Sequence, residues 1–349
     1  MDIEALTCCK TEFCPTMSSV EQTLLQAEND SLKRELAELK EKQNYCRVKY
    51  CASTLQPDVL CMETGLPTKE IFNVVVNYVS RFENSLNYYS GWRVESIKIE
   101  DQILLTLMKL RQNYTNLHLA QLFHCSTATI SNVLLTFIHV LCRLLFDDAM
   151  GTVPSRDKNK TSLPESFVTF SNCRMIIDCT DVKIEAPKLL SDQKLTYSTY
   201  RGMHSFKVLI GVAPNAAITY VSKLFPGSVS DKAVVQQSGL LDIFKPGDLI
   251  LADKGFLIQD IVPNGVAVNI PPFLNKGQFT ESEIKLTKNI ARNRIHVERA
   301  NARIKDFKIL DCIPYHLKPH ADKVVKLCAS LVNLQFSLIR EIRNTLETN

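Results

Sequence analysis

The run RMIIDCTDVKI at residues 174–184 constrains the fold of this chain more than any other stretch. Met175, Ile176 and Ile177 are successive apolar residues, which predict a short buried strand. The strand ends on a carboxylate, Asp178. An acid on a buried strand is held by a rigid element, which is a common way to present a metal ligand. The pattern alone is not specific, because aspartates at strand ends also form turns and cap helices.

Two further segments supply acids in matching positions. DLILADKGF (248–256) predicts a second apolar strand that ends on Asp253, and RNRIHVERANARIKDF (292–307) predicts a basic helix that carries Glu298. Carboxylates are hard oxygen ligands suited to Mg²⁺ or Mn²⁺. Two such ions about 3.5–4 Å apart can activate an attacking hydroxyl and stabilise the leaving oxygen. With Asp178, these acids therefore have the composition of a two-metal site that cuts phosphodiester bonds.

Several ordered runs resemble those of a known family, the DDE transposases and transposase-derived nucleases of the Harbinger type. The matching runs are IIDCTDVKIEAP, YRGMHSFKVLIGVAP, FPGSVSDKAVVQQSGLL, LILADKGF, NIPPFL and RIHVERANARIKDFKIL. Arg294, Glu298 and Lys305 also fit the R-(3)-E-(6)-K spacing around the catalytic glutamate of related bacterial transposases. The resemblance extends from about Ile99 to the C-terminus. It implies that the three acids named above are the catalytic triad and the metal ligands.

The resemblance also implies a fold, an activity and partners. The expected fold is α/β, with a ribonuclease-H-like (retroviral-integrase-like) catalytic domain after a helical helix-turn-helix module. The expected protein is a DNA transposase or transposase-derived endonuclease that uses two Mg²⁺ (or Mn²⁺) ions for cleavage and for strand transfer. The alternative is a domesticated DNA-binding protein that retains the fold and has lost the reaction. DNA is the expected partner, an accessory DNA-binding protein is a further candidate, and the nucleus is the expected location.

The bulk composition indicates a soluble intracellular protein. The 349 residues are 45% apolar and 22% charged with a net charge of +4, which is ordinary for a soluble protein. Twelve cysteines without a signal peptide indicate a reducing compartment. The longest apolar stretch, LLTFIHVLCRLLF, is interrupted by His139 and Arg143. It is expected to be too short to span a bilayer, so no membrane contact is expected.

Residues 1–19 are expected to be irregular, because they lack a clear periodicity. Their cysteines and the next ones along the chain could supply thiolates for zinc: Cys8, Cys9, Cys14, Cys46, Cys51 and Cys61. The first histidine of the chain is His118, and the Cys/His pattern of a THAP-type zinc finger is missing. Unpaired thiols are therefore favoured over a zinc site.

Residues 20–43 carry a heptad pattern that predicts a short N-terminal coiled coil. The d positions hold Leu25, Leu32 and Leu39, and the a positions hold Asn29 and Leu36. The g positions hold Glu28 and Glu35, and the e positions hold Lys33 and Lys40. An Asn at position a fixes the register, and opposite charges at g and e′ favour a parallel homodimer. The alternative is a solvated amphipathic helix, because three heptads are marginal alone.

Residues 99–147 predict a helix-turn-helix module that contacts DNA. This region follows a linker and a helix (44–98) in which Thr68 is expected to be the cap. The expected elements of the module are helices at 99–112, 116–123 and 127–146, with a turn at 124–126. Thr127, Thr129 and Asn132 are expected to be exposed toward the major groove. The alternative is a plain helical bundle, which has the same periodicity.

A polar, Pro-punctuated linker (148–167) is expected to precede the endonuclease domain (168–345). Strands are predicted at 174–178, with an extension toward 184, and at 206–212, 219–224 and 248–253. Helices are predicted at 231–238, with Ser230 as the cap, and at 321–342. The segment 266–287 is expected to be an irregular insertion over the site.

Other polar side chains near the triad have expected roles. Asp181 rivals Asp178, but the family places its first acid before a Thr, in D-G-T or D-C-T, which selects Asp178. Asp181 and Asp231 are expected to lie beside the metal ligands without binding metal themselves. On the basic helix, Arg294, Arg299 and Lys305 are expected to contact DNA phosphates, and a solvated charged helix is the alternative.

A zinc site near the C-terminus is not expected. Cys312, His316 and His320 have ligand-like spacing. Pro314 and Pro319 interrupt the helix that would align these three side chains.

Overall fold

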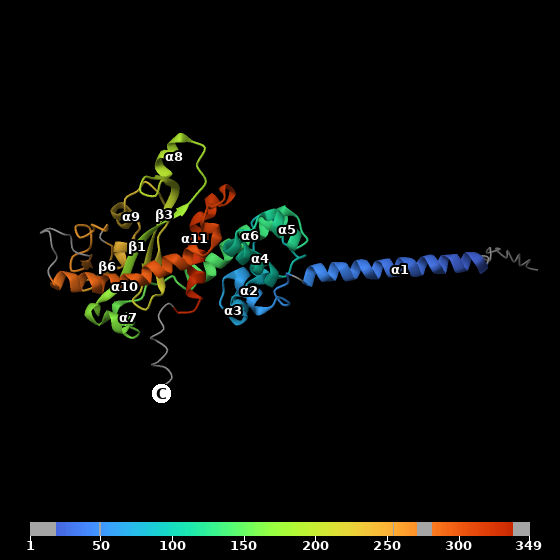
Figure 1. Ribbon diagram of the computed structural model, residues 1–349, viewed down its shortest axis with the longest axis horizontal. Coiled ribbons are helices and arrows are strands. Elements are labelled where there is room, and N and C mark those ends of the chain that lie inside the picture. Colours follow the sequence, from blue (N-terminus) through green and yellow to red (C-terminus); the bar gives the residue numbers. More distant parts are fainter. Residues whose placement is uncertain (1–18, 49, 254, 271–280, 338–349) are drawn as a thin grey trace, which may run out of the picture. The chain divides into compact units, whose positions relative to one another are not determined.

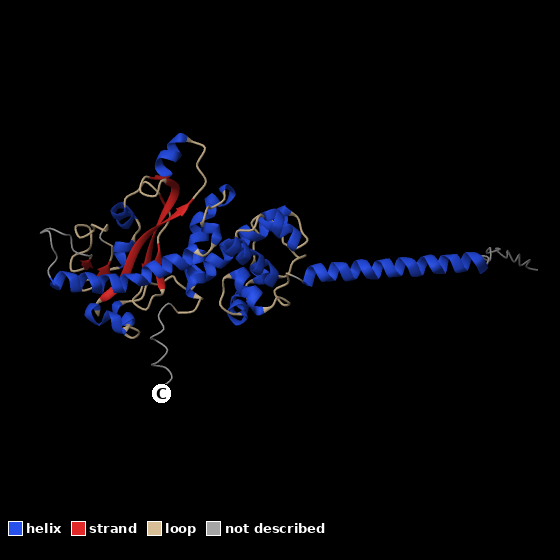
Figure 2. Cartoon of the chain, in the orientation of Figure 1, coloured by secondary structure: helices blue, strands red, loops and turns tan. Residues whose placement is uncertain are grey.

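The computed structural model describes residues 19–48, 50–253, 255–270 and 281–337. The chain divides into two units, Met1–Cys51 and Ala52–Asn349. Within the larger unit, helices dominate the first part, and a mixed sheet with flanking helices dominates the second part (Figure 1; Figure 2).

The smaller unit contains one long helix, α1 (Ser19–Val48), which covers the predicted heptad region. The leucines of the heptad core are all more than half exposed: 53% for Leu25, 59% for Leu32, 53% for Leu36 and 63% for Leu39. An ion pair joins Lys33 Nζ and Asp30 Oδ1 at 3.7 Å on the surface, where such pairs contribute little. The helix is therefore confirmed, and its pairing with a second chain stays a prediction.

A helical module opens the larger unit. Its helices are α2 (Pro57–Thr64), α3 (Lys69–Ser80), α4 (Ile99–Gln112), α5 (Asn116–Leu122) and α6 (Thr127–Leu141). The hydroxyls of Thr68, Thr115 and Ser126 each accept a backbone N–H in the first turn of α3, α5 and α6. Asn113 ends α4 in the left-handed conformation, with φ of 56°. The predicted helix, turn and helix are therefore confirmed, whereas α2 is an additional element.

The apolar helix α6 continues as a π-helical segment, η2 (Cys142–Asp148). The two together, Thr127–Asp148, extend beyond the apolar run LLTFIHVLCRLLF on both sides and are long and apolar enough to cross a membrane by length and composition. Most of its apolar part, 61%, is buried inside the fold, as in the core helix of a soluble protein. The fully buried side chains of this helix include Ile130, Phe137 and Leu141.

The stretch expected to be a linker is partly folded. It contains the short helix α7 (Arg156–Lys160) and the start of the 3-10 helix η3 (Glu165–Phe170). Phe167 is fully buried and stacks on His296, with ring centroids 5.8 Å apart. Arg174 Nε donates to the carbonyl of Pro154 at 2.9 Å. The prolines and polar residues of this stretch therefore mark short turns that pack on the sheet.

A mixed sheet organises the rest of the larger unit. Its central strand, β1 (Cys173–Lys183), pairs antiparallel with β3 (Met203–Val212) and parallel with β6 (Leu249–Leu251). The short strands β2 (Tyr197–Ser198), β4 (Ile218–Val221) and β5 (Phe225–Pro226) pair antiparallel with β3, and β7 (Ala267–Asn269) pairs parallel with β6. The four predicted strands are confirmed, and β1 includes the predicted extension.

Side chains alternate between the two faces of the sheet along β1. Met175 and Ile177 share a buried cluster with Val234 and Val235 of α9 (Asp231–Gln237), which Ser230 caps as predicted. The long helix α10 (Glu281–Lys305) contacts β1 and β3, and α11 (Ala321–Asn333) contacts β4 and α10. Figure 1 shows α10 running across the strands.

Two expected boundaries in this region are wrong. The segment 266–287 was expected to be irregular, but it contains β7 and the start of α10, and its residues 271–280 lie outside the described residues. A strand of three residues is too short for alternation to reveal it. The last helix, expected at 321–342, ends at Asn333, and residues 338–349 lie outside the described residues.

Candidate active site

Asp178 lies within β1, opposite Ile210 of β3, and not at the end of a strand as expected. Asn301 Nδ2 on α10 donates to Asp178 Oδ2 at 2.8 Å. Burial raises the pKa of Asp178 to about 6; Arg294 acts to lower this pKa, and Asp253 acts to raise it. These opposing effects mean that the Asp178 carboxyl is close to both a cation and a second acid.

Arg294 joins the other two acids. Its Nη1 lies 3.1 Å from Asp253 Oδ1, and its Nη2 lies 3.5 Å from Glu298 Oε1. The Arg294 side chain is 13% exposed, whereas those of Asp253 and Glu298 are 49% and 57% exposed. Two of the predicted acids therefore pair with one guanidinium and are open to solvent. The third, Asp178, lies close enough to Arg294 and Asp253 for their charges to act on its pKa. Within the described part of the chain, the oxygens of the three acids do not all lie within 4.8 Å of one another.

The two neighbouring acids have protein partners of their own. Asp231 Oδ1 lies 2.9 Å from Lys207 Nζ. Asp181 accepts a hydrogen bond from Ser205 Oγ at 2.7 Å and pairs with Arg201 Nε at 3.5 Å. Alternation along β1 also assigns Asp181 to the face opposite Asp178. Neither acid needs a metal ion to balance its charge.

Asn301 is a residue of this site that the sequence interpretation missed. It follows Glu298 by three positions on α10, and it is 7% exposed. Its amide nitrogen donates to Asp178, while its Oδ1 is buried and has no hydrogen-bond partner within the described part of the chain. The available signal was its spacing from Glu298, because residues i and i+3 of a helix are neighbours on its surface.

The basic residues of α10 have different surroundings. Arg294 was expected to contact DNA, but its guanidinium pairs with two acids and is largely covered. Arg299 is exposed. The pKa of Lys305 is lowered, first by desolvation and then by Arg201, while Asp181 and Asp178 act in the opposite direction. Lys305 therefore lies close enough to Asp178 and Asp181 for their negative charges to act on its pKa.

The candidate DNA-reading residues of α6 do not share one environment. Thr127 is exposed and Thr129 is half-buried. Asn132 is fully buried: its Nδ2 donates to the carbonyl of Trp92 at 2.9 Å, and its Oδ1 accepts the backbone N–H of Ser90 at 2.9 Å. The prediction that Asn132 faces DNA is therefore wrong, because its amide fixes the chain before α4.

The remaining candidate ligand groups lie apart from the triad. Among the described residues, Cys312, His316 and His320 do not form a metal-binding group, and His320 Nδ1 lies 3.0 Å from His139 Nε2 instead. The first four N-terminal cysteines of the candidate zinc set lie outside the described side chains.

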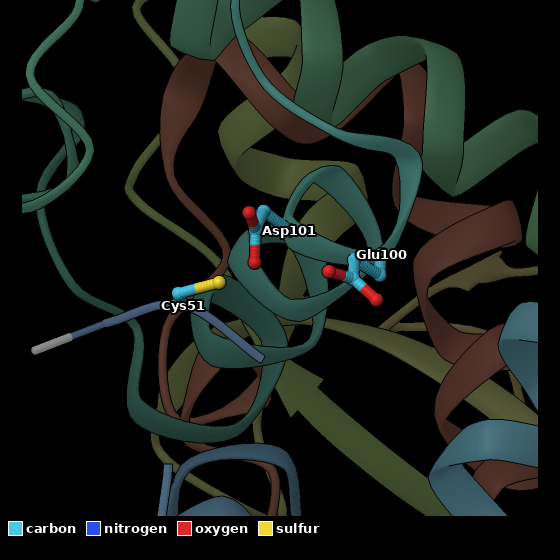
Figure 3. A group of neighbouring side chains, drawn as sticks. All are labelled: Cys51, Glu100 and Asp101. Atoms are coloured by element: carbon cyan, nitrogen blue, oxygen red, sulfur yellow. The ribbon is translucent and has the colours of Figure 1, made fainter. Parts of the chain in front are cut away.

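Two acids outside the predicted site lie in the first turn of α4, Glu100 and Asp101 (Figure 3). Asp101 Oδ1 accepts the backbone N–H of Ala52 at 2.8 Å. Carboxylates are favourable at the N-terminus of a helix, because the helix dipole is positive there. Cys51, also labelled in Figure 3, belongs to the smaller unit.

Comparison with known proteins matches the two main regions of the larger unit. Residues 177–333 match the DDE superfamily endonuclease family, and residues 96–147 match the helix-turn-helix of DDE superfamily endonuclease. Proteins named "Putative nuclease HARBI1" are similar to this chain. The one from Xenopus laevis is 28% identical over 170 residues, which are 46% of this chain and 45% of the relative.

The relatives from two mammals match over a shorter region. The protein of the same name from Rattus norvegicus is 34% identical over 87 residues, and that from Homo sapiens is 32% identical over 88 residues; each match covers 24% of both chains. The chain thus spans less than half the length of each of these relatives. No solved structure matches the chain. The resemblance to Harbinger transposase-derived nucleases is confirmed, and the chain matches the helix-turn-helix model and the endonuclease model of the DDE superfamily in that order.

Proposed function

We propose that this protein is a DNA transposase or transposase-derived endonuclease that cuts phosphodiester bonds with divalent metal ions. Asp178, Asp253 and Glu298 are the proposed catalytic residues and metal ligands. The observation that carries the proposal is the gathering of these acids around Arg294, inside the region that matches DDE endonucleases. Strand transfer of the freed 3′-hydroxyl to target DNA is the further step expected of a transposase.

The residues of the site fit two Mg²⁺ or Mn²⁺ ions. All three acids offer hard oxygen ligands, and the buried Asn301 Oδ1 is an additional oxygen without a partner. When bound, the ions would activate the attacking hydroxyl and stabilise the leaving oxygen. Asn301 and the sheet fix the position of Asp178, whereas the exposed Asp253 and Glu298 are accessible to ions and to DNA. Arg299 and Lys305 would bind the phosphates beside the cut.

A cleavage assay tests this function directly. The substrate is DNA that carries the terminal inverted repeats flanking the genomic copy, incubated with the full chain and Mg²⁺ or Mn²⁺. We expect cuts that require the metal and stop in excess chelator. Tight binding of this DNA without cleavage under either metal would support the alternative, a domesticated DNA-binding protein that has lost the reaction.

We also propose a ribonuclease-H-like, retroviral-integrase-like fold for the endonuclease region. Across the sheet, the strands follow the order β4-β3-β1-β6-β7, in which β3 is antiparallel to both neighbours and β1, β6 and β7 are parallel. This order, with a long helix carrying the last acid, supports the assignment. An experimental structure with a different strand order would contradict it.

Thr127 and Thr129, at the start of α6, are the proposed readers of DNA sequence. They lie in the first turn of the second helix of the helix-turn-helix, which is the part of this motif that contacts base edges. Replacing both with Val keeps their shape and removes both hydroxyls. We expect the variant to lose preference for specific over random DNA while its salt-dependent binding persists. Unchanged discrimination would reject the assignment.

We propose that α1 forms a parallel coiled coil with a second copy of the chain. The support is its row of exposed leucines together with the expected pairing of Glu28 and Glu35 with Lys33 and Lys40. The double substitution Leu32→Pro and Leu36→Pro would break the helix. Sedimentation should then give the variant half the mass of the wild-type protein, and equal masses would contradict the proposed dimer.

The nucleus is the proposed location, because the proposed substrate is genomic DNA. Exclusion of a fluorescently tagged chain from the nucleus would contradict this. An accessory DNA-binding protein is a further proposed partner. It is not required if the purified chain selects repeat DNA as well as a nuclear extract does.

A further inference from the structure

Asn301 combines two properties that are not explained by packing alone. Its Nδ2 donates to Asp178 Oδ2 at 2.8 Å, and its side chain is 7% exposed. Its Oδ1 is buried and has no hydrogen-bond partner among the residues that the structure describes. Most buried polar atoms are paired, so an unpaired one is a candidate to receive a partner from outside the chain, such as an ion or a water molecule.

The orientation of the Asn301 amide follows from its neighbour. An ionised Asp178 can only accept hydrogen bonds, so the NH₂ group must face this carboxylate. The amide oxygen is then directed away from Asp178 and cannot be satisfied by it. Since Glu298 precedes Asn301 by three positions on α10, the two side chains lie on neighbouring parts of the helix surface.

An amide oxygen is a hard ligand of the kind that Mg²⁺ and Mn²⁺ accept alongside carboxylates. It adds an oxygen without adding negative charge to a site that already contains three acids. A second effect comes from the NH₂ group, because a hydrogen bond to a metal-binding carboxylate fixes the orientation of that ligand.

We propose that Asn301 is a further metal-site residue, which orients Asp178 through Nδ2 and offers Oδ1 as a neutral oxygen ligand. This inference rests on the proposed metal-dependent function of the three acids. It assigns the 292–307 segment two site residues, Glu298 and Asn301, in place of one.

Binding of Mn²⁺ to the full chain without DNA tests the inference, measured by calorimetry and by loss of the free-ion electron paramagnetic resonance signal. Asn301→Leu removes both amide atoms while keeping the branching of the side chain, and it should weaken Mn²⁺ binding about 10- to 100-fold. Asn301→Asp keeps an oxygen ligand but loses the donor to Asp178, so it should bind Mn²⁺ more tightly than Asn301→Leu does. The matched control is Asn293→Leu, because Asn293 is also buried on α10 with an unpartnered Oδ1. This control should bind Mn²⁺ like the wild type.

The outcomes separate the two levels of the proposal. If Asp178→Asn loses Mn²⁺ while a folded Asn301→Leu protein retains wild-type affinity, the role of Asn301 is wrong and the metal site stands. Should Asn301→Leu fail to fold, as judged by circular dichroism in chelator, wild-type Mn²⁺ affinity of a folded Asn301→Ala protein, which lacks both amide atoms, would overturn the role instead. A wild-type protein that binds no Mn²⁺ would refute both the inference and the proposed function.

Discussion

Two long, charged helices of this protein, α1 and α10, both have an apolar face, but the chain itself buries only that of α10. The apolar face of α10 is covered by the chain's own sheet, and Val297 and Ile304 on that face are 0% and 1% exposed. The heptad leucines of α1 are instead open to solvent: Leu25 and Leu32, for example, are 53% and 59% exposed. Periodicity therefore identifies which face of a helix is apolar, but not whether the same chain or a second chain covers it.

The strongest way to break this comparison is to place a charge on each apolar face. Val297→Asp puts an acid into the packed interior between α10 and the sheet. It should lower the free energy of unfolding by at least about 3 kcal/mol, because a buried unpaired charge is costly. Leu32→Asp should change the stability of the Ala52–Asn349 unit by no more than about 0.5 kcal/mol. Urea unfolding followed by circular dichroism compares the two, and similar losses would contradict the account.

A second prediction concerns the acid that α10 covers. Burial raises the pKa of Asp178 from 3.8 to about 6, so the folded protein binds this proton more tightly than the unfolded chain does. The contribution of this group to stability is present below pH 3.8 and is lost as pH rises through about 6. The shift corresponds to at most about 3 kcal/mol at 1.36 kcal/mol per unit.

Asp178→Asn removes this titration and should therefore stabilise the metal-free protein above pH 6. Its advantage over the wild type should grow between pH 4 and pH 6 and then level off. Chemical unfolding in chelator across this range measures the difference. If the free energies of unfolding of the two proteins change with pH in parallel, burial by α10 does not raise the pKa of Asp178.

The parts of the fold that the sequence predicts well are those with local signals. α4 is predicted at its observed bounds, because its apolar periodicity ends where Asn113 adopts the left-handed conformation. β1 is predicted with its acid, because its apolar run is uninterrupted. Among the site residues, the sequence motifs predicted the three acids, and the structure pairs two of them, Asp253 and Glu298, with Arg294.

The errors come from contacts between segments that are distant in sequence. Asn132 was expected to face DNA, yet it is buried, and its amide bonds to the backbone of Ser90 and Trp92. Asn301 was missed because its partner, Asp178, lies on a different element. Arg294 looked like a phosphate contact until the position of Asp253 was known. Helix periodicity contains no information about such partners.

A third prediction, with a smaller expected effect, concerns the proposed pairing of α1 with a second chain. Asn29 is the polar residue at a core position of the heptad, and its burial in a dimer is expected to fix the register at a cost in stability. Asn29→Leu should tighten self-association by about 1–3 kcal/mol and permit larger oligomers. Sedimentation equilibrium measures both effects. An unchanged mass distribution would mean that Asn29 is not in a helix interface.

The most direct measurement of the central claim compares cleavage and DNA binding for Asp253→Asn. Asp253 is half exposed and contacts Arg294, so the change removes an anionic ligand while keeping the shape of the side chain. We expect the variant to lose Mg²⁺-dependent cleavage of repeat DNA and to keep its affinity for that DNA, with Asp181→Asn as the milder control. Full metal-dependent cleavage by the Asp253→Asn protein would contradict the account.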